Sequence, residues 1–200
     1  MSYGHLKVIV GPMGASKTSS LLKEALWAKN GLGRETLVFR PAFDDRYTNS
    51  GEIVTHDGLR MPATTVSTLE VLPAIINQGS LVIFDEIQFF DDIHVSGDVI
   101  ELIRRYLLAG TDVTVGGLDI DVFGKPFLIT AQLMAMADSI EKRHSHCAIC
   151  GRPSTKTFKK GGTEETIELG TFAEIYETRC NDHWHPFRAP LFSIMRGDKT

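Results

Sequence analysis

The sequence of 200 residues has only three cysteines, no strong excess of charge and no long apolar run. Three cysteines are too few for a disulfide framework, and an odd number favours a metal site or a free thiol. A formal net charge of −4 argues against a surface devoted to nucleic acid. Because no stretch reaches the roughly 18 to 20 apolar residues of a membrane helix and residues 1–5 show no signal peptide, we expect a cytoplasmic protein with no membrane partner.

Strand-like and helix-like segments alternate along the first two thirds of the chain. Short β-branched apolar runs, typical of strands buried on both faces, occur at residues 6–10, 36–39, 81–84 and 113–118. Helical spacing of apolar residues occurs at 18–29, 99–108 and 127–137. This alternation predicts an α/β fold, in which helices flank a mostly parallel sheet and ligands bind at the carboxyl ends of its strands.

The composition divides the chain into three parts. Residues 44–61, rich in Asp, Thr, Asn and Gly, are predicted to form a long loop. The strong helix patterns stop after about residue 143, and all three cysteines follow that point. We therefore expect a domain at 1–144, a small lobe at 145–190 with a hairpin tip or lid at 159–162, and a tail at 191–200.

A glycine-rich segment at residues 11–18 joins the first strand-like run to the first helix-like run. This context is typical of a Walker A phosphate loop, whose backbone N–H groups wrap phosphates at a helix N-terminus. Lys17 would then reach the β and γ phosphates, and the Thr18 hydroxyl would bind Mg²⁺. Ser16 replaces the usual glycine before the lysine, so altered nucleotide affinity is expected. The predicted phosphate-binding residues are Gly11, Pro12, Met13, Gly14, Ala15, Ser16, Lys17, Thr18 and Ser19.

Two carboxylates, Asp85 and Glu86, follow the apolar run at 81–84. Proteins with a phosphate loop place an aspartate at the end of a neighbouring strand, where it supports Mg²⁺. Asp85 fits that role, and Glu86 could remove a proton from a nucleophile. The alternative is a solvated acidic turn, which is common after a strand.

The cysteines form two short pairs of metal-ligand spacing, Cys147 with Cys150 and Cys180 with His183. Three thiolates and one imidazole are typical of a closed structural Zn²⁺ site. A redox Cys-x-x-Cys is the main alternative, but it would leave Cys180 and His183 without a role. His185 is a second possible fourth ligand.

The successive motifs resemble those of the type II thymidine kinase family, the cytosolic thymidine kinase class, over roughly residues 5–187. The order and approximate spacing of the motifs carry this resemblance. The matching segments are Gly11-Pro12-Met13 with Lys17-Thr18, Asp44-Asp45-Arg46-Tyr47, Asp85-Glu86-Ile87-Gln88-Phe89-Phe90, and Leu118-Asp119 followed by Lys125-Pro126-Phe127.

The resemblance implies transfer of the γ-phosphoryl group of ATP to the 5′-hydroxyl of thymidine, with deoxyuridine as a further possible substrate. By matching position, Glu86 would be the catalytic base, and Lys17 and Arg46 would stabilise phosphate charge. Thr18 and Asp85 would organise Mg²⁺. Phosphoryl transfer needs positioning and charge neutralisation more than covalent chemistry, which agrees with these residue types.

The resemblance also implies a nucleoside site and an assembly. The expected nucleoside-binding residues are Met13, Phe89, Leu118, Phe127, Thr155, Gly170, Thr171, Phe172 and Tyr176. Members of the family are commonly homotetramers inhibited by thymidine triphosphate, so both properties are expected here. The lobe would be held together by zinc and would close over the nucleoside.

Two other functions remain open at this point. A zinc lobe on a phosphate-loop domain is compatible with a nucleic-acid-binding ATPase, and basic residues do cluster in and before the lobe. Acidic residues follow at once, however, so we expect no sustained basic face and no nucleic-acid partner. The basic residues are Arg143, Arg152, Lys156, Lys159 and Lys160, and the acidic ones are Glu164, Glu165, Glu168, Glu174 and Glu177. The third possibility, an inactive phosphate-loop fold, is encouraged by Ser16 alone.

Overall fold

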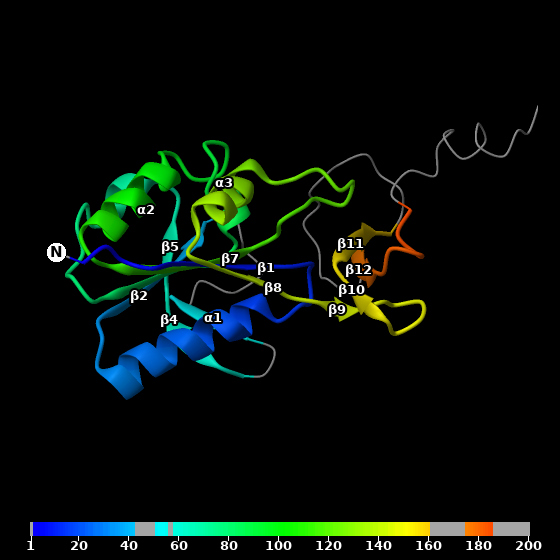
Figure 1. Ribbon diagram of the computed structural model, residues 1–200, viewed down its shortest axis with the longest axis horizontal. Helices are drawn as coiled ribbons and strands as arrows, with labels where there is room; N and C mark the ends of the chain where they lie inside the picture. The colour runs from blue at the N-terminus through cyan, green and yellow to red at the C-terminus, as the bar shows by residue number, and fades with distance from the viewer. Residues whose placement is uncertain (1, 43–50, 56–57, 161–174, 186–200) are drawn as a thin grey trace, which may run out of the picture.

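The computed structural model describes residues 2–42, 51–55, 58–160 and 175–185, and a six-stranded sheet forms its centre (Figure 1). All paired neighbours in this sheet are parallel, so the predicted α/β class is confirmed. In spatial order the strands are β5 (Thr64–Val66), β2 (Thr36–Pro41), β6 (Leu81–Phe84), β7 (Asp112–Gly117), β1 (Leu6–Val10) and β8 (Ser139–Lys142).

Helices cover both faces of the sheet (Figure 1). Helix α1 (Lys17–Leu26), which continues as a π-helical turn at Trp27–Gly31, lies on one face. Helices α2 (Val99–Leu108) and α3 (Leu128–Met136) lie on the other. Short 3₁₀ helices follow β5 at Leu69–Val71 and β6 at Ile87–Phe89.

Each face of the sheet has its own hydrophobic core. Leu21 and Leu22 of α1 pack with Ile83 on one side, while Tyr106 of α2 packs with Phe84 on the other. Every residue of β6 is therefore buried, which explains its continuous apolar sequence. Since burying one large apolar side chain contributes about 1.5 to 3 kcal/mol, these two layers supply most of the drive to fold.

The structure differs from the predicted long loop at residues 44–61. Strands β3 (Glu52–Val54) and β4 (Arg60–Pro62) form an antiparallel hairpin there, and Ile53 and Met61 pack in the α1-side core. Three-residue strands are shorter than the pattern that periodicity can detect, so this part of the loop prediction is wrong. Residues 43–50 and 56–57 of the segment lie outside the described residues.

The strand order also corrects one expectation. We expected the strand before Asp85 to be a neighbour of the strand that enters the phosphate loop, but β7 lies between β6 and β1. The chain leaves β6, forms α2 and returns as β7, which pairs with β6 on one side and with β1 on the other. The carboxyl ends of all three strands still meet at one edge of the sheet, where ligands bind in open α/β folds.

After β8 the chain forms small sheets at one end of the molecule (Figure 1). Strand β9 (Ser145–His146) pairs with β10 (Pro153–Ser154), and β11 (Lys156–Lys159) pairs with β12 (Tyr176–Arg179), both antiparallel. Residues 161–174 between β11 and β12, which include the predicted lid glycines, and the predicted tail lie outside the described part. The division near residue 144 stays a prediction. Within the described ranges, no helix is both long and apolar enough to cross a membrane.

Candidate active site

The predicted phosphate loop runs from the end of β1 to the start of α1 and contains three residues of positive φ. Gly11 has φ 152° and Gly14 has φ 70°. A Cβ on Gly11 would lie 2.6 Å from the carbonyl oxygen of Arg143, so this position has no room for a side chain. Ser16 has φ 55° and ψ 35°, a left-handed conformation that costs a residue other than glycine about 1 to 2 kcal/mol. The loop is therefore held in a shape that the chain does not adopt freely.

Lys17 is folded over this loop. Its Nζ donates a hydrogen bond to the carbonyl oxygen of Pro12 at 2.9 Å, and the residue is buried. This hydrogen bond connects the two ends of the loop. It places the ammonium group next to the backbone groups that are predicted to bind phosphates. A buried cation at a helix N-terminus favours an anionic ligand there.

The two predicted motifs meet through Thr18 and Asp85. The Thr18 hydroxyl donates a hydrogen bond to Asp85 Oδ2 at 2.9 Å, although the two residues are 67 positions apart. Asp85 Oδ1 accepts a second bond from the Glu86 N–H at 3.0 Å. Burial, with a smaller contribution from the charge of Glu86, raises the pKa of Asp85 to about 7. A hydroxyl and a carboxylate this close provide the oxygen donors that Mg²⁺ prefers, so the residues fit the predicted magnesium role.

The raised pKa of Asp85 predicts that the metal-free protein is destabilised by this carboxylate. The folded state holds the proton up to about pH 7, whereas the unfolded chain loses it near pH 4, so stability falls as the pH rises between these values. Asp85→Asn keeps one hydrogen bond and removes the charge. We expect it to raise the free energy of unfolding at pH 8 by about 1 to 3 kcal/mol.

Urea unfolding without Mg²⁺ at pH 5 and pH 8 measures this effect, and the gain should be smaller at pH 5. Asp92→Asn, at an exposed carboxyl nearby, is the matched control and should change neither stability nor its pH dependence. An Asp85→Asn protein that is less stable than the parent at pH 8 would contradict the prediction.

Glu86 follows Asp85 after the end of β6, and the side chain of Gln88 connects it to the end of β7. Its backbone is left-handed, with φ 52° and ψ 46°. The side-chain amide nitrogen of Gln88, Nε2, donates to Glu86 Oε2 at 2.6 Å, and its side-chain oxygen, Oε1, accepts from the Leu118 N–H at 2.9 Å. Gln88 is buried, and a Cβ on Gly117 would lie 2.4 Å from its Oε1. The carboxylate is thus oriented by an amide that is itself fixed to the end of β7.

Gln88 is a site residue to which the sequence analysis assigned no role. The signal was present, because a glutamine within the apolar run Ile87 to Phe90 is unusual for a buried segment. A buried side-chain amide needs partners for its oxygen and its nitrogen. Its partners are Glu86, which is close in the sequence, and Leu118, which is distant. Only the fold identifies Leu118 as a partner.

Four of the predicted nucleoside residues surround the same edge of the sheet. The Met13 N–H donates to the Thr157 hydroxyl at 3.1 Å, which connects the phosphate loop to β11. Phe89 is buried, and its ring packs against that of His94 with the centroids 5.2 Å apart and the planes at 65°. Leu118 follows β7 directly, and its N–H donates to the side chain of Gln88. Phe127, at the start of α3, is partly buried.

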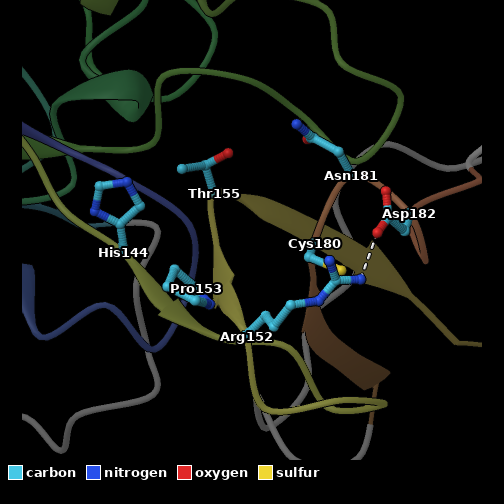
Figure 2. Close-up of a pocket in the computed structure, with 7 residues that line it drawn as sticks. All are labelled: His144, Arg152, Pro153, Thr155, Cys180, Asn181 and Asp182. Carbon is cyan, nitrogen blue, oxygen red and sulfur yellow. Dashed lines mark hydrogen bonds and ion pairs between the residues drawn. The ribbon is translucent and has the colours of Figure 1, made fainter.

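The structure gives the other predicted nucleoside residues different positions. Tyr176 is buried in β12. Thr155 lines a cavity of about 390 Å³, whose other lining residues come from the small lobe and its junction with the main sheet (Figure 2). Thr157, which the sequence analysis did not select, is the threonine that contacts Met13. Arg46, Gly170, Thr171 and Phe172 lie outside the described residues, so their roles stay predictions.

The predicted metal ligands come together in the small lobe. One ligand atom from each of Cys147, Cys150, Cys180 and His183 lies within 4.8 Å of the others. Cys150 Sγ is 3.8 Å from Cys180 Sγ, and Cys180 Sγ is 3.3 Å from His183 Nδ1. Ligands about 2.0 to 2.3 Å from a tetrahedral Zn²⁺ lie roughly 3.3 to 3.8 Å from one another, so this cluster fits zinc. His185, the alternative ligand, does not belong to it.

Backbone and side-chain contacts support the cluster from outside. Each of the two short pairs of predicted ligands lies in a turn. The Gly151 N–H donates to the Cys147 carbonyl at 2.8 Å, and the His183 N–H donates to the Cys180 carbonyl at 3.0 Å. The Arg152 guanidinium donates to Cys150 Sγ at 3.4 Å, which lowers the pKa of that thiol and favours the thiolate. Arg152 also pairs with Asp182 (Figure 2).

Trp184, next to the predicted ligand His183, connects the cluster to other parts of the chain. Its indole N–H donates to the Thr157 carbonyl at 3.0 Å. A Cβ on Gly124 would lie 2.8 Å from the Trp184 ring, so the indole also touches the turn at residues 121–125. The cluster is therefore tied both to β11 and to the loop that precedes Phe127.

Comparison with known proteins agrees with this arrangement. A profile of the thymidine kinase family matches residues 4–184. The thymidine kinase of Thermococcus kodakarensis is 35% identical over 194 residues, covering 90% of this chain and 93% of that protein. Those of Onion yellows phytoplasma and Aster yellows witches'-broom phytoplasma are 33% and 34% identical over 186 residues, covering 90% of this chain and 86% of each relative. The chain therefore belongs to the thymidine kinase family.

Proposed function

We propose that this thymidine kinase transfers the γ-phosphoryl group of ATP to thymidine where the phosphate loop meets the ends of β6 and β7. The hydrogen bond of 2.9 Å between Thr18 and Asp85 carries the proposal, because it joins the phosphate-binding motif to the acidic strand end. Glu86 follows Asp85 directly, so phosphate, metal and base groups share one edge of the sheet. This grouping is what in-line phosphoryl transfer needs.

The phosphate loop and Lys17 bind and orient ATP. Backbone N–H groups of residues 11–19 would wrap the phosphates, and Lys17 would exchange its bond to the Pro12 carbonyl for a phosphate oxygen. Thr18 and Asp85 would hold Mg²⁺, which supplies charge neutralisation at the phosphates when bound. Arg46 would add a second cation, a role proposed from the resemblance.

Glu86 would remove the proton from the 5′-hydroxyl of the nucleoside as the hydroxyl oxygen attacks the γ-phosphorus. One of its carboxylate oxygens accepts a hydrogen bond from the Gln88 side-chain amide at 2.6 Å, which holds the carboxylate in one orientation at this edge of the sheet. A base is effective only when it is within hydrogen-bond reach of that proton. Gln88 is therefore a positioning residue for Glu86.

The nucleoside would lie between the main domain and the lobe. Met13, Phe89, Leu118 and Phe127 would enclose the thymine ring on the side of the main sheet. Thr155 and Tyr176 would contribute from the lobe, with Gly170, Thr171 and Phe172 as the further predicted contacts. Deoxyuridine, which differs from thymidine by one methyl group, would also be accepted, because a single methyl changes binding by only about 1 to 3 kcal/mol.

The remaining properties of the enzyme are proposed on the resemblance and the cluster. Zn²⁺ would be structural, since four protein ligands leave no position open for catalysis. The active form would be a homotetramer in the cytoplasm, inhibited by thymidine triphosphate. The domain at 1–144 would bind ATP, and the lobe at 145–190 would cover the nucleoside.

A product assay tests the proposed function. Purified protein with ATP and Mg²⁺ should consume ATP only when thymidine is present and should yield a product heavier than thymidine by one phosphoryl group. DNA should have no effect. Thymidine-independent ATP consumption that DNA stimulates would instead favour the nucleic-acid-binding ATPase, and absence of any turnover would favour the inactive fold.

A further inference from the structure

Arg143 lies where the main sheet ends and the chain turns toward the lobe. It follows β8 directly, and its backbone N–H donates to the Val10 carbonyl at 2.7 Å. This bond continues the pairing of β8 with β1 to the point where β1 enters the phosphate loop. The carbonyl of Arg143 fills the space beside Gly11. The backbone of Arg143 therefore packs against the beginning of the loop.

The side chain of Arg143 holds the far end of the same loop. Its Nε donates to the Ala15 carbonyl at 2.9 Å. Its Nη1 donates to the hydroxyl of Ser20 on α1 and, at 2.9 Å, to Glu141 Oε1. The guanidinium thus connects the loop, the first turn of α1 and the end of β8.

These contacts hold the chain on both sides of Ser16, which is itself exposed. Ala15 precedes it, and Ser20 bonds to it twice, through its N–H at 3.2 Å and its hydroxyl at 3.3 Å, both to the Ser16 carbonyl. Ser16 is the residue in the left-handed conformation that usually belongs to glycine. A strained backbone of this kind persists only when its surroundings determine it strongly, and the Arg143 contacts provide such surroundings.

We infer that Arg143 is a positioning residue that holds the phosphate loop in its ATP-binding shape and thereby compensates for serine at position 16. This inference rests on the proposed binding of ATP at the loop. Arginine suits the task because Nε and Nη1 of one rigid plane reach the Ala15 carbonyl and the Ser20 hydroxyl together. A lysine ammonium group has a single nitrogen on a flexible stem and does not reproduce this geometry.

A double-mutant cycle with Arg143→Met and Ser16→Gly tests the inference. In the parent, Arg143→Met should weaken ATP binding about fivefold to tenfold, because the strained loop is no longer held. The KM for thymidine should stay within about twofold of the parent. In the Ser16→Gly background the same substitution should change ATP affinity less than about twofold, since glycine adopts the left-handed conformation without strain. Isothermal titration with ATP and Mg²⁺ gives the dissociation constants.

Three controls make the cycle decisive. Arg104→Met removes an arginine of α2 that contacts Met136, and it should leave ATP affinity unchanged. Arg143→Lys keeps the charge but not the geometry, so it should resemble Arg143→Met. Ser20→Ala removes the hydroxyl that accepts from Arg143 Nη1, with little risk to folding. It should also weaken ATP binding, and the loss should be larger in the parent than in the Ser16→Gly background.

Equal losses of ATP affinity in both backgrounds would overturn the inference, as would full affinity in Arg143→Lys. Thermal unfolding of each variant identifies a general loss of structure; if Arg143→Met does not fold, the Ser20→Ala cycle decides. Lys17→Met separates this inference from the proposed function. If ATP binding survives that change, ATP does not bind at the loop and the proposed function itself fails.

Discussion

Replacing Glu86 with glutamine is expected to lower kcat for thymidine phosphorylation by about 10²- to 10⁴-fold, the contribution that a positioned general base commonly makes. The glutamine side chain has the same shape as glutamate but cannot accept the proton of the 5′-hydroxyl. It can still accept the hydrogen bond from Gln88, so the local structure should be retained. The KM values for thymidine and ATP should therefore change little.

Steady-state kinetics with each substrate varied separately measures this effect. Glu70→Gln, at an exposed glutamate in the 3₁₀ helix after β5, is the matched control and should have the kcat of the parent. A Glu86→Gln enzyme with a kcat within tenfold of the parent would remove Glu86 from the base role. A rise in KM with an unchanged kcat would assign Glu86 to substrate binding instead.

Loss of the metal from the Cys147, Cys150, Cys180 and His183 cluster is expected to abolish nucleoside binding while ATP binding is largely kept. Structural zinc contributes on the order of 10 kcal/mol to the folding of a small domain, and among the described residues of the lobe few apolar side chains are buried. Without the metal, Trp184 and Thr157 would lose their places against the turn at 121–125 and against Met13. The phosphate loop, built on the main sheet, does not need these contacts.

Cys180→Ser tests this expectation because Cys180 is a buried ligand candidate. Metal analysis should give one zinc per chain in the parent and none in the variant, and calorimetry should show a large loss of thymidine affinity but a small change for ATP. His185→Asn is the matched control and should keep both zinc and thymidine binding. Full zinc content in Cys180→Ser, or unchanged thymidine affinity in a zinc-free protein, would contradict the structural role.

Fluorescence of the lobe gives a second readout of zinc removal. The chain has two tryptophans, and Trp27 is exposed on the π-helical turn after α1. In a Trp27→Phe background the emission comes from Trp184 alone. Chelation should shift this emission to longer wavelength as the indole leaves its contact with Thr157 and becomes exposed to water.

Elements with a complete local signal could be predicted from the sequence. The boundaries expected for residues 6–10, 81–84 and 99–108 are those of β1, β6 and α2. The two strands are continuous apolar runs because they are buried on both faces. Helix α2 has an apolar stripe, and Asp98 caps its N-terminus by accepting from the Glu101 N–H at 2.9 Å. Local chemistry and burial agree in all three.

The hairpin at residues 52–62 and the order of the strands could not be predicted in the same way. Strands β3 and β4 have three residues each, too few for a period of two to be recognised. The position of β7 between β1 and β6 depends on how the chain crosses over after α2. Hydrophobic pattern predicts that a strand is buried, but it contains no information on which strand it pairs with.

The sequence by itself determined the type of fold, the phosphate loop, the acidic strand end and the four metal-ligand candidates, because each of these is encoded by residues close together in the chain. Only the tertiary structure decided that the Gln88 amide donates to Glu86, that Thr157 contacts Met13 and that Arg143 contacts the predicted phosphate loop. In the last two of these contacts the partners are more than a hundred residues apart, and the side chain of Gln88 also accepts from the N–H of Leu118, which follows β7. The physical reason is that a hydrogen bond depends on distance in space, which the packing of strands and helices sets.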